Sequence, residues 1–380
     1  MTTATQPIGL YQNGGGSNLI QRPQDGRRVN LSLVLQSLYD EPQLTRAQLA
    51  RQTGLTKVTI SDLVSELIDH ELVQETGITA GVRPGKPAVA LAVREDSYDV
   101  LALDLSAPAT WRGAVYSLRG HKQAEASVEL DGRTGADAVE AAYELVQALI
   151  ERSTRRILGV GVGSPGTVDA DGMVVAAPNL DWRHVELQKL ISRRFSLMTT
   201  VLNDANAAVI AESAFTDSAS DLVRVQISRG VGAGVLLDGS LVIGNCAAGG
   251  EIGHLVIEYQ GALCACGKRG CLETWLSVPA LTRRLAANAR DGVETLAEAG
   301  RRLGMALAPI VATLDLPEIV VGGPQDLVKG PLMDACLALI IERTHTEFRR
   351  DISMRLSDLG DEAVLLGAVS FVLRTTLGVS

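Results

Sequence analysis

The sequence predicts an α/β protein that begins with a separate winged helix-turn-helix. Two observations carry this prediction. Apolar strands alternate with helical stretches from about Val100 onward, and a glycine turn joins two short helical segments well before that point. The chain has 380 residues, of which 46% are apolar, which is enough for two or three domains. We expect a disordered arm over residues 1–25, the winged helix-turn-helix over 26–95 and the α/β domain over 96–380.

Charge is distributed unevenly along the chain. Residues 1–90 carry eight basic and eight acidic residues, so the net charge of -9 belongs entirely to the remainder. Five of those eight acidic residues fall between Asp62 and Glu75, which groups the basic residues before and after them. A localised basic face that suits DNA is therefore compatible with an acidic protein.

The sequence argues against a membrane protein and against a secreted protein held by disulfides. No apolar run approaches the roughly 18 to 20 residues that span a bilayer, and Met1 to Asn18 lacks the apolar core of a signal peptide. We expect a cytoplasmic protein without membrane contact. Three of the five cysteines fall within eight residues, which suits metal binding better than a secreted disulfide framework. Cys246 and Cys336 are expected to be buried.

Helical patterns occupy much of the first seventy residues. Val29 to Tyr39 has apolar residues at helical spacing. Thr45 and Gln48 have the spacing of a capping box, which predicts a short second helix. Gly54 supplies a tight turn, and Thr56 can cap a third helix. The buried face of that helix is expected to consist of Ile60, Leu63, Val64, Leu67 and Ile68.

The third helix and the residues after it suit DNA. Outward residues near the helix start are short or basic groups that can meet phosphates and base edges in a major groove. Ile78–Val93 has a basic tip rich in glycine and proline followed by alternating apolar residues, which predicts a hairpin wing. A helix-turn-helix pattern alone is common, and a module for protein contacts is the alternative. The residues expected to contact double-stranded DNA are Lys57, Thr59, Ser61, Arg83 and Lys86.

The remainder of the chain alternates strands and helices. Strands are expected near Val100–Leu103, Ile157–Val162, Thr199–Leu202, Leu222–Ile227, Gly234–Leu237 and Ile319–Val321. Helices are expected near Ala136–Ile150, Ala205–Phe215, Leu281–Ala287, Leu296–Leu314 and Met333–Phe348. Because many α/β folds share this alternation, motifs must decide the function.

The most specific motif contains one histidine and three cysteines, namely His254, Cys264, Cys266 and Cys271. One imidazole and three thiolates at this spacing suit tetrahedral zinc. Four protein ligands would close the site, so a structural Zn²⁺ is expected and not a hydrolytic one. The alternative is a group of reduced thiols beside an unrelated histidine. Cys-x-Cys is too short for an ordinary internal disulfide.

Five ordered motifs support a family resemblance. They are Gly163-Ser164-Pro165-Gly166, Pro178-Asn179-Leu180-Asp181-Trp182, Asn203-Asp204-Ala205-Asn206-Ala207, Gly250-Glu251-Ile252-Gly253-His254, and the segment from Cys264 to Glu273. With them the chain resembles the ROK family of bacterial repressors, open reading frames and sugar kinases, and in particular regulators of the xylose and N-acetylglucosamine repressor type. The resemblance runs from about Val29 to Gly367. It implies a two-lobed, actin-like (ribonuclease-H-like) ROK domain.

The resemblance also implies a sugar effector and the residues that bind it. Carried over by motif, these are Asn179, Asn203, Asp204, Glu251, His254 and Glu273. Carboxylates and amides can form paired hydrogen bonds with vicinal hydroxyls, and such a pocket rejects ligands that lack them. His254 could bind zinc through one ring nitrogen and donate to a sugar oxygen from the other.

Two functions remain open, a regulator and a ROK-type sugar kinase with a fused DNA-binding domain. Asp204 matches the general base of the kinases. Family kinases open this domain with Asp-x-Gly-Gly-Thr, whereas Asp104-Leu105-Ser106-Ala107-Pro108 lacks both glycines and contains a proline without a backbone donor. The second phosphate loop reads Gly230-Val231-Gly232-Ala233-Gly234 without its hydroxyl, while Gly322-Gly323 is retained. We therefore predict a regulator that is not an enzyme.

The predicted mechanism requires an oligomer, either a homodimer or a homotetramer. Two recognition helices of a dimer would enter successive major grooves of a pseudo-palindromic operator. Sugar binding would favour a geometry in which the two helices no longer match the half-sites. The coupling would equal the difference in sugar affinity between the two states.

Overall fold

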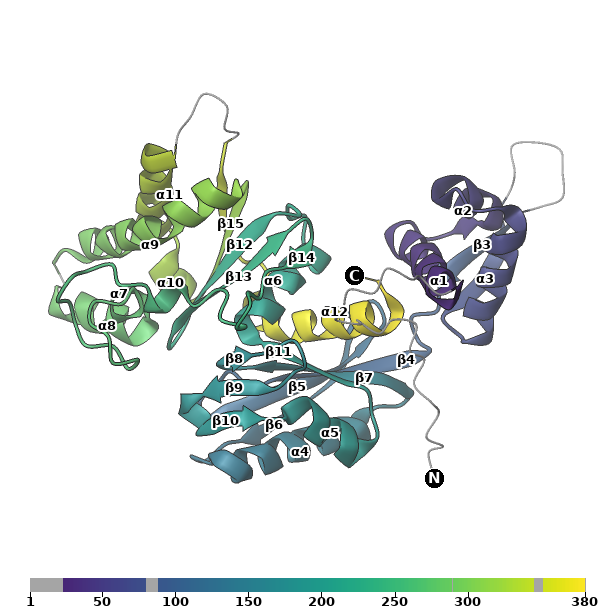
Figure 1. Cartoon of the computed structure of the whole chain (residues 1–380), viewed down its shortest axis with the longest axis horizontal. Helices are drawn as coiled ribbons and strands as arrows, with labels where there is room; N and C mark the ends of the chain where they lie inside the picture. The colour runs from purple at the N-terminus through teal and green to yellow at the C-terminus, as the bar shows by residue number, and fades with distance from the viewer. Residues whose placement is uncertain (1–22, 80–87, 289, 345–350, 380) are drawn as a thin grey trace. The chain divides into compact units, whose positions relative to one another are not determined.

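The computed structural model describes residues 23–79, 88–288, 290–344 and 351–379 (Figure 1). These residues fall into two compact units. Unit 1 takes its described residues from Met1–Ser164, Asp171–Val201 and Ala368–Ser380, and unit 2 from Pro165–Ala170 and Leu202–Gly367. The segment 26–95 therefore shares unit 1 with the first large sheet. None of the described helices is long and apolar enough to cross a bilayer.

Three helices and a three-stranded antiparallel sheet form the N-terminal part of unit 1. The helices are α1 (Pro23–Asp40), α2 (Arg46–Thr53) and α3 (Lys57–Asp69). The strands β1 (Leu44–Thr45), β2 (Val73–Thr79) and β3 (Ala88–Val93) are ordered β1-β3-β2. The expected helices and hairpin strands are present. Residues 23–25 belong to α1, so the C-terminal boundary of the arm predicted over 1–25 is wrong. The predicted hairpin tip, 80–87, lies outside the described residues.

Local capping explains why α2 and α3 begin and end where they do. The Thr45 side chain accepts from the Gln48 backbone and the Gln48 side chain accepts from the Thr45 backbone, which confirms the capping box. Gly54 ends α2 at φ 72°, in the left-handed region that favours glycine. Thr56 caps α3 by accepting from the Thr59 N–H at 3.2 Å. These short-range bonds fix the turn between the two helices.

The C-terminal end of α1 is bound to the first large sheet through Arg119. Its guanidinium donates to the carbonyls of Tyr39 at 2.6 Å and Leu38 at 3.1 Å, and it lies 4.7 Å from the centre of the Tyr39 ring. A cation at this end of a helix satisfies carbonyls that have no helical partner. The Tyr39 hydroxyl donates to the Leu118 carbonyl at 3.0 Å, and burial raises the pKa of Tyr39. Ser32 Oγ also donates to the Leu377 carbonyl at 2.9 Å.

The large sheet of unit 1 has the strand order β11-β7-β4-β5-β6. Its strands are β4 (Tyr98–Asp104), β5 (Thr110–Ser117), β6 (Lys122–Glu129), β7 (Arg156–Ser164) and β11 (Thr199–Asn203). Helices α4 (Gly135–Arg152) and α5 (Leu187–Phe195) cover one face, and the unit 1 part of α12 (Ala363–Leu377) covers the other (Figure 1). Gly161 permits this packing, since a Cβ there would lie 2.3 Å from the Ala368 carbonyl oxygen. A hairpin of β9 (Val174–Ala177) and β10 (Trp182–Val185), with the 3-10 turn η1 (Pro178–Leu180) between its strands, completes the unit.

The sheet of unit 2 repeats this topology with the order β14-β13-β12-β15-β16. In both sheets the first strand is central, the next two lie on one side and the last two on the other. The strands are β12 (Leu222–Ile227), β13 (Val231–Leu237), β14 (Ser240–Leu241), β15 (Glu318–Gly322) and β16 (Ser353–Leu356). The other elements are β8 (Thr167–Val168), α6 (Asp204–Phe215), η2 (Ile252–His254), α7 (Glu273–Leu276), α8 (Val278–Ala287), α9 (Gly292–Leu314), α10 (Gln325–Val328), α11 (Pro331–Thr344) and η3 (Gly360–Glu362). Two α/β lobes of one design agree with the predicted two-lobed fold.

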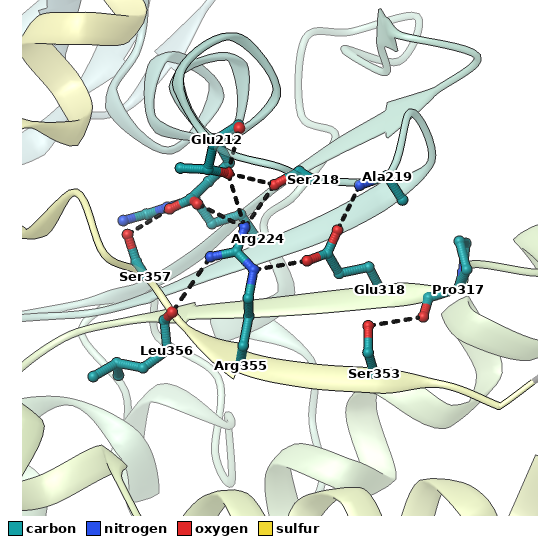
Figure 2. Close-up of polar contacts among 11 residues, drawn as sticks. Glu212, Ser218, Ala219, Arg224, Pro317, Glu318, Ser353, Arg355, Leu356 and Ser357 are labelled. Atoms are coloured by element: carbon teal, nitrogen blue, oxygen red, sulfur yellow. Dashed lines mark hydrogen bonds and ion pairs between the residues drawn. The ribbon is translucent and has the colours of Figure 1, made fainter.

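A buried ionic network joins four elements of unit 2 (Figure 2). Arg224 on β12 is 1% exposed, and its Nε donates to Glu212 Oε1 at 3.2 Å. Glu212 on α6 is fully buried and also accepts from Arg355 Nη2 at 3.0 Å and from Ser357 Oγ. Arg355 on β16 donates through Nε to Glu318 on β15 at 2.8 Å. Because buried charges must be paired, the network fixes α6 relative to the sheet.

The predicted alternation is confirmed at every expected strand and helix. The last expected helix ends at Thr344, and residues 345–350 lie outside the described part. Cys336 is buried as expected, but the prediction for Cys246 is wrong because this thiol is exposed. Several elements were not predicted, among them β5, β6, β16 and α12.

Removing Arg224 should destabilise the protein strongly. Arg224→Met removes the more deeply buried of the two cations that pair with the buried Glu212 carboxylate, so we expect a loss of about 3–5 kcal/mol in the free energy of unfolding. Arg301→Met is the matched control, because Arg301 pairs with Glu294 and Glu298 on the exposed side of α9. That change should cost at most about 1 kcal/mol. Urea unfolding measures the free energy of unfolding of both variants. Equal losses of free energy in the two variants would show that the buried network does not stabilise the fold.

Candidate functional site

One histidine and three cysteines meet at the end of η2 and in the segment that follows it. The ligand atoms of His254, Cys264, Cys266 and Cys271 all lie within 4.8 Å of one another. His254 Nδ1 is 3.7 Å from the Cys264 sulfur, and the sulfurs of Cys266 and Cys271 are 3.6 Å apart. A turn closed by Cys264 N–H donating to the Lys268 carbonyl at 2.8 Å brings the cysteines together. The cluster could hold a metal ion.

The thiols of the cluster differ in acidity. Burial raises the pKa of Cys271 to about 12 and also raises the pKa of Cys264. A hydrogen bond from the Lys268 backbone lowers the pKa of Cys266. A divalent cation that binds as a thiolate complex must therefore displace protons from the two buried thiols.

His254 presents its two ring nitrogens to different partners. Nδ1 faces the thiols, whereas Nε2 lies 3.9 Å from Glu251 Oε2. Glu251 precedes η2 and its side chain is 44% exposed, so its carboxylate is accessible to a ligand. The nitrogen near the thiols is therefore the one available to a metal ion, and the other nitrogen lies beside a carboxylate.

Glu273 opens α7, two residues after Cys271, the last cysteine of the cluster. Its Oε2 accepts from the Val231 N–H at 3.2 Å, and its Oε1 lies 3.7 Å from the Cys264 sulfur. The carboxylate therefore lies between the metal-binding segment and the start of β13. Sequence reasoning placed Glu273 beside the cluster without identifying this contact to the strand.

A stack of side chains around Trp275 holds α7, and sequence reasoning missed it. The guanidinium carbons of Arg284 and Arg302 lie 3.4 Å and 3.6 Å from the centre of the Trp275 ring. Two groups so close to one ring centre must occupy opposite faces, which places the indole between cations from α8 and α9. Trp275 Nε1 donates to Glu258 Oε2 at 2.8 Å, which ties the metal-binding segment to the same stack.

Asn203 and Asp204 form a second polar group, at the start of α6. Asn203 Oδ1 accepts from the Asn206 N–H at 3.1 Å and so caps the helix, while its Nδ2 donates to the Gly166 carbonyl at 2.8 Å. Asp204 Oδ1 accepts from the Ala205 N–H and from Asn203 Nδ2. These bonds fix the Asp204 carboxylate, as a binding residue requires.

Strand β13 joins the two groups through close backbone packing. A Cβ at Gly234 would lie 2.6 Å from the Ala205 carbonyl oxygen, next to Asp204. On the other side, a Cβ at Gly250 would lie 1.8 Å from the Ala233 carbonyl oxygen, and one at Gly253 would lie 2.1 Å from that of Val231. Gly234 of the predicted phosphate loop thus serves packing within a strand and not only a turn.

Asn179 and the residues predicted to contact DNA lie outside the two polar groups described above. Asn179 is exposed in η1 of unit 1, whereas the other five predicted sugar residues belong to unit 2. Lys57 and Ser61 are exposed on α3, but Thr59 is half-buried and its hydroxyl lies 2.9 Å from that of Thr56. Arg83 and Lys86 lie outside the described residues.

Two cavities adjoin these groups in unit 2. One, of about 440 Å³, borders the cluster and is lined by Cys264, Glu273, Arg283 and Arg284 among others. The other, of about 390 Å³, lies at the carboxyl ends of the parallel strands β12 and β15 and includes Ser228, Gly322 and Gly323. Such ends are usual ligand sites in α/β folds.

Comparisons with known proteins agree with the resemblance. The sequence model of the ROK family matches residues 110–375. A xylose repressor of Caldicellulosiruptor bescii is 26% identical, over 92% of this chain and 97% of its own length. The crystal structure of a ROK family transcriptional regulator, a homolog of the E. coli MLC protein, has a TM-score of 0.81 at 24% identity and covers 92% of this chain and 96% of its own. A ROK family glucokinase from Streptomyces griseus, solved with glucose and AMPPNP, has a TM-score of 0.63 at 26% identity and covers 72% of this chain and 98% of its own.

Replacing one cluster thiol should remove metal. Cys266→Ser deletes one of the four converging ligands, so we expect the metal bound per chain to fall to less than half. Cys246→Ser is the matched control, since Cys246 is also an exposed thiol but lies outside the cluster. Elemental analysis of both purified variants checks this. Full metal content in Cys266→Ser would show that the thiol is not a ligand.

Proposed function

The chain belongs to the ROK family, and from this premise we propose that it is a sugar-responsive, DNA-binding transcriptional repressor. The length of the alignments carries the proposal. The repressor and the regulator structure align with 92% of this chain, whereas the glucokinase aligns with 72%. The family match begins at residue 110, so the helices α1 to α3 precede it. A ROK domain with such an N-terminal addition suits a regulator.

The N-terminal addition is proposed to be a winged helix-turn-helix that binds an operator. Support comes from the order α2, glycine turn, α3 and the following hairpin of β2 and β3. Lys57 and Ser61 on α3 offer a cation and a hydroxyl to DNA. Two such modules in a homodimer or homotetramer would read two half-sites.

Zn²⁺ is the proposed occupant of the cysteine cluster. One imidazole and three thiolates form a closed tetrahedral set, which suits a structural role and leaves no open position for hydrolysis. The ion would brace the segment between Glu251 and Glu273. Both carboxylates would then be oriented by metal binding, although neither would be a ligand.

A sugar is the proposed effector, bound by Asn203, Asp204, Glu251, His254 and Glu273, with Asn179 as a further candidate. The carboxylates and the amide supply acceptors and donors for vicinal hydroxyls. Their orientation by caps, strand packing and the cluster is the support for this assignment. The relative is named a xylose repressor, so a pentose or related sugar is a natural first probe.

Loss of kinase activity is proposed from the altered phosphate segments. Asp104 is buried and accepts from the Ser106 N–H at 2.9 Å and from its hydroxyl at 2.6 Å. The segment therefore folds back on the Asp104 side chain, and Pro108 offers no N–H to a phosphate. Gly232 and Gly234 lie inside β13, and close packing against α6 already requires the second of these two glycines.

Replacing Glu273 should produce a repressor that no longer responds to sugar. Glu273→Ala removes an acceptor for a sugar hydroxyl, so the sugar concentration needed to release operator DNA should rise roughly 5- to 150-fold. Metal content and operator affinity without sugar should stay near wild type, since Glu273 is outside the ligand set. A thermal-shift screen of neutral, amino and N-acetylated sugars supplies the effector, and operator titration with that sugar gives the result.

Glu294→Ala is the control for this change, because Glu294 is an exposed carboxylate on α9 of the same unit. It should leave the sugar response unchanged. If Glu273→Ala releases the operator at the wild-type sugar concentration, the assignment of Glu273 fails. If no sugar stabilises the wild-type chain or releases its DNA, the sugar response itself fails.

The chain should not phosphorylate sugars. An ATP-coupled assay with neutral, amino and N-acetylated sugars should give no turnover above that of Asp204→Asn, which lacks the carboxylate that matches the kinase base. Sugar-dependent ATP consumption near about 1 per second, an ordinary enzyme rate, would instead support the alternative of a kinase with a fused DNA-binding domain.

A further inference from the structure

The outward face of α3 contains one apolar residue among polar ones. Lys57, Val58, Ser61, Asp62 and Ser65 are exposed, and at 100° per residue they form one continuous face. The opposite face packs into the core through Ile60, Leu63, Val64 and Leu67. Val58 is near the middle of the outward face, in the first turn after the Thr56 cap.

Folding gives no reason for valine at this position. Its side chain is 72% exposed, so it adds little to the core. Valine also lowers helix propensity relative to alanine or a long polar residue, because its branched side chain loses rotamers in a helix. The Val58 side chain is therefore not needed for packing and is accessible to a binding partner.

Thr59 is not a candidate for a contact outside the folded chain. Its hydroxyl lies 2.9 Å from the Thr56 hydroxyl and its side chain is half-buried. The two side chains together cap the helix start. Of the first three residues of α3, only Lys57 and Val58 are therefore exposed.

We propose that Val58 selects thymine in the operator by packing against its C5 methyl group in the major groove. This inference rests on the proposed DNA-binding function and deepens it. Residues at the N-terminal end of a recognition helix contact base edges. Thymine is the one ordinary base that presents a methyl group there, and apolar side chains read it. Lys57 and Ser61, which lie on the same side of Val58 around the helix, would hold phosphates or polar base edges.

The test uses the full chain and DNA that differs only by methyl groups. An operator is first selected with the wild-type protein from a randomised duplex library. Each thymine is then replaced in turn by uracil, which removes the C5 methyl and keeps the hydrogen-bonding groups. Wild type should lose about fourfold in affinity at one thymine of each half-site, as expected for one buried methyl group.

Val58→Ala should bind the thymine operator about fourfold more weakly and be insensitive to uracil at that same position. Val293→Ala is the matched control, because Val293 is 71% exposed at the same second position of α9 in the other unit. It should keep the uracil sensitivity of wild type. Melting temperatures should not fall in either variant, since alanine has the higher helix propensity.

Three outcomes would count against the inference. If uracil weakens Val58→Ala as much as wild type at every thymine, or if wild type is insensitive to all uracils, Val58 does not read a methyl group. These results leave the DNA-binding function intact, since an operator would have been selected. If the wild-type chain enriches no sequence, the proposed function fails and this inference fails with it.

Discussion

The attachment of α1 to the first sheet is the constraint on which a regulatory role depends. Arg119 satisfies two terminal carbonyls of α1 and stacks on Tyr39, whose hydroxyl is bonded to Leu118. Tyr98 adds a bond from its hydroxyl to the His70 carbonyl, beyond the end of α3. A helix-turn-helix on a loose linker would read DNA regardless of what the rest of the chain bound. Because these contacts join α1 and α3 to the sheet, a rearrangement of the sheet can reach the helices.

The polar groups of unit 2 are organised by backbone packing more than by side-chain packing. Gly234, Gly250 and Gly253 let α6 and the segment around η2 approach strand β13 at distances that a Cβ would forbid. Asp204 and Glu251 are thus attached to the same strand, and Glu273 binds its first residue. This explains why Gly234 persists where phosphate binding is proposed to be lost, since all three glycines are needed for packing. Substituting them would displace the polar groups even in a chain that never binds nucleotide.

Sequence reasoning succeeded where a short pattern determines the structure. The Thr45 and Gln48 capping box and the Gly54 turn involve neighbours only, and β4 is a mostly apolar strand that is buried along its whole length. It failed for β6, whose residues alternate between exposed and half-buried positions and carry few apolar side chains. The cysteine cluster was predictable from spacing. The Trp275 stack was not, since its partners Arg284 and Arg302 come from separate helices and nothing in their spacing marks them.

The proposed conversion of a kinase fold into a regulator requires a change in only one part of the site. An enzyme must bind its transition state more tightly than its substrate, which demands phosphate contacts aimed at the transferred group. A regulator needs only a difference in sugar affinity between two conformations. The carboxylates that would bind sugar hydroxyls are useful to an enzyme and to a regulator. The phosphate segment is useful only to an enzyme. In this chain Asp104 bonds to Ser106 in its own segment, while Asp204 and Glu273 remain fixed by neighbouring N–H groups. The residues proposed to bind sugar hydroxyls are therefore the ones whose side-chain positions the fold maintains.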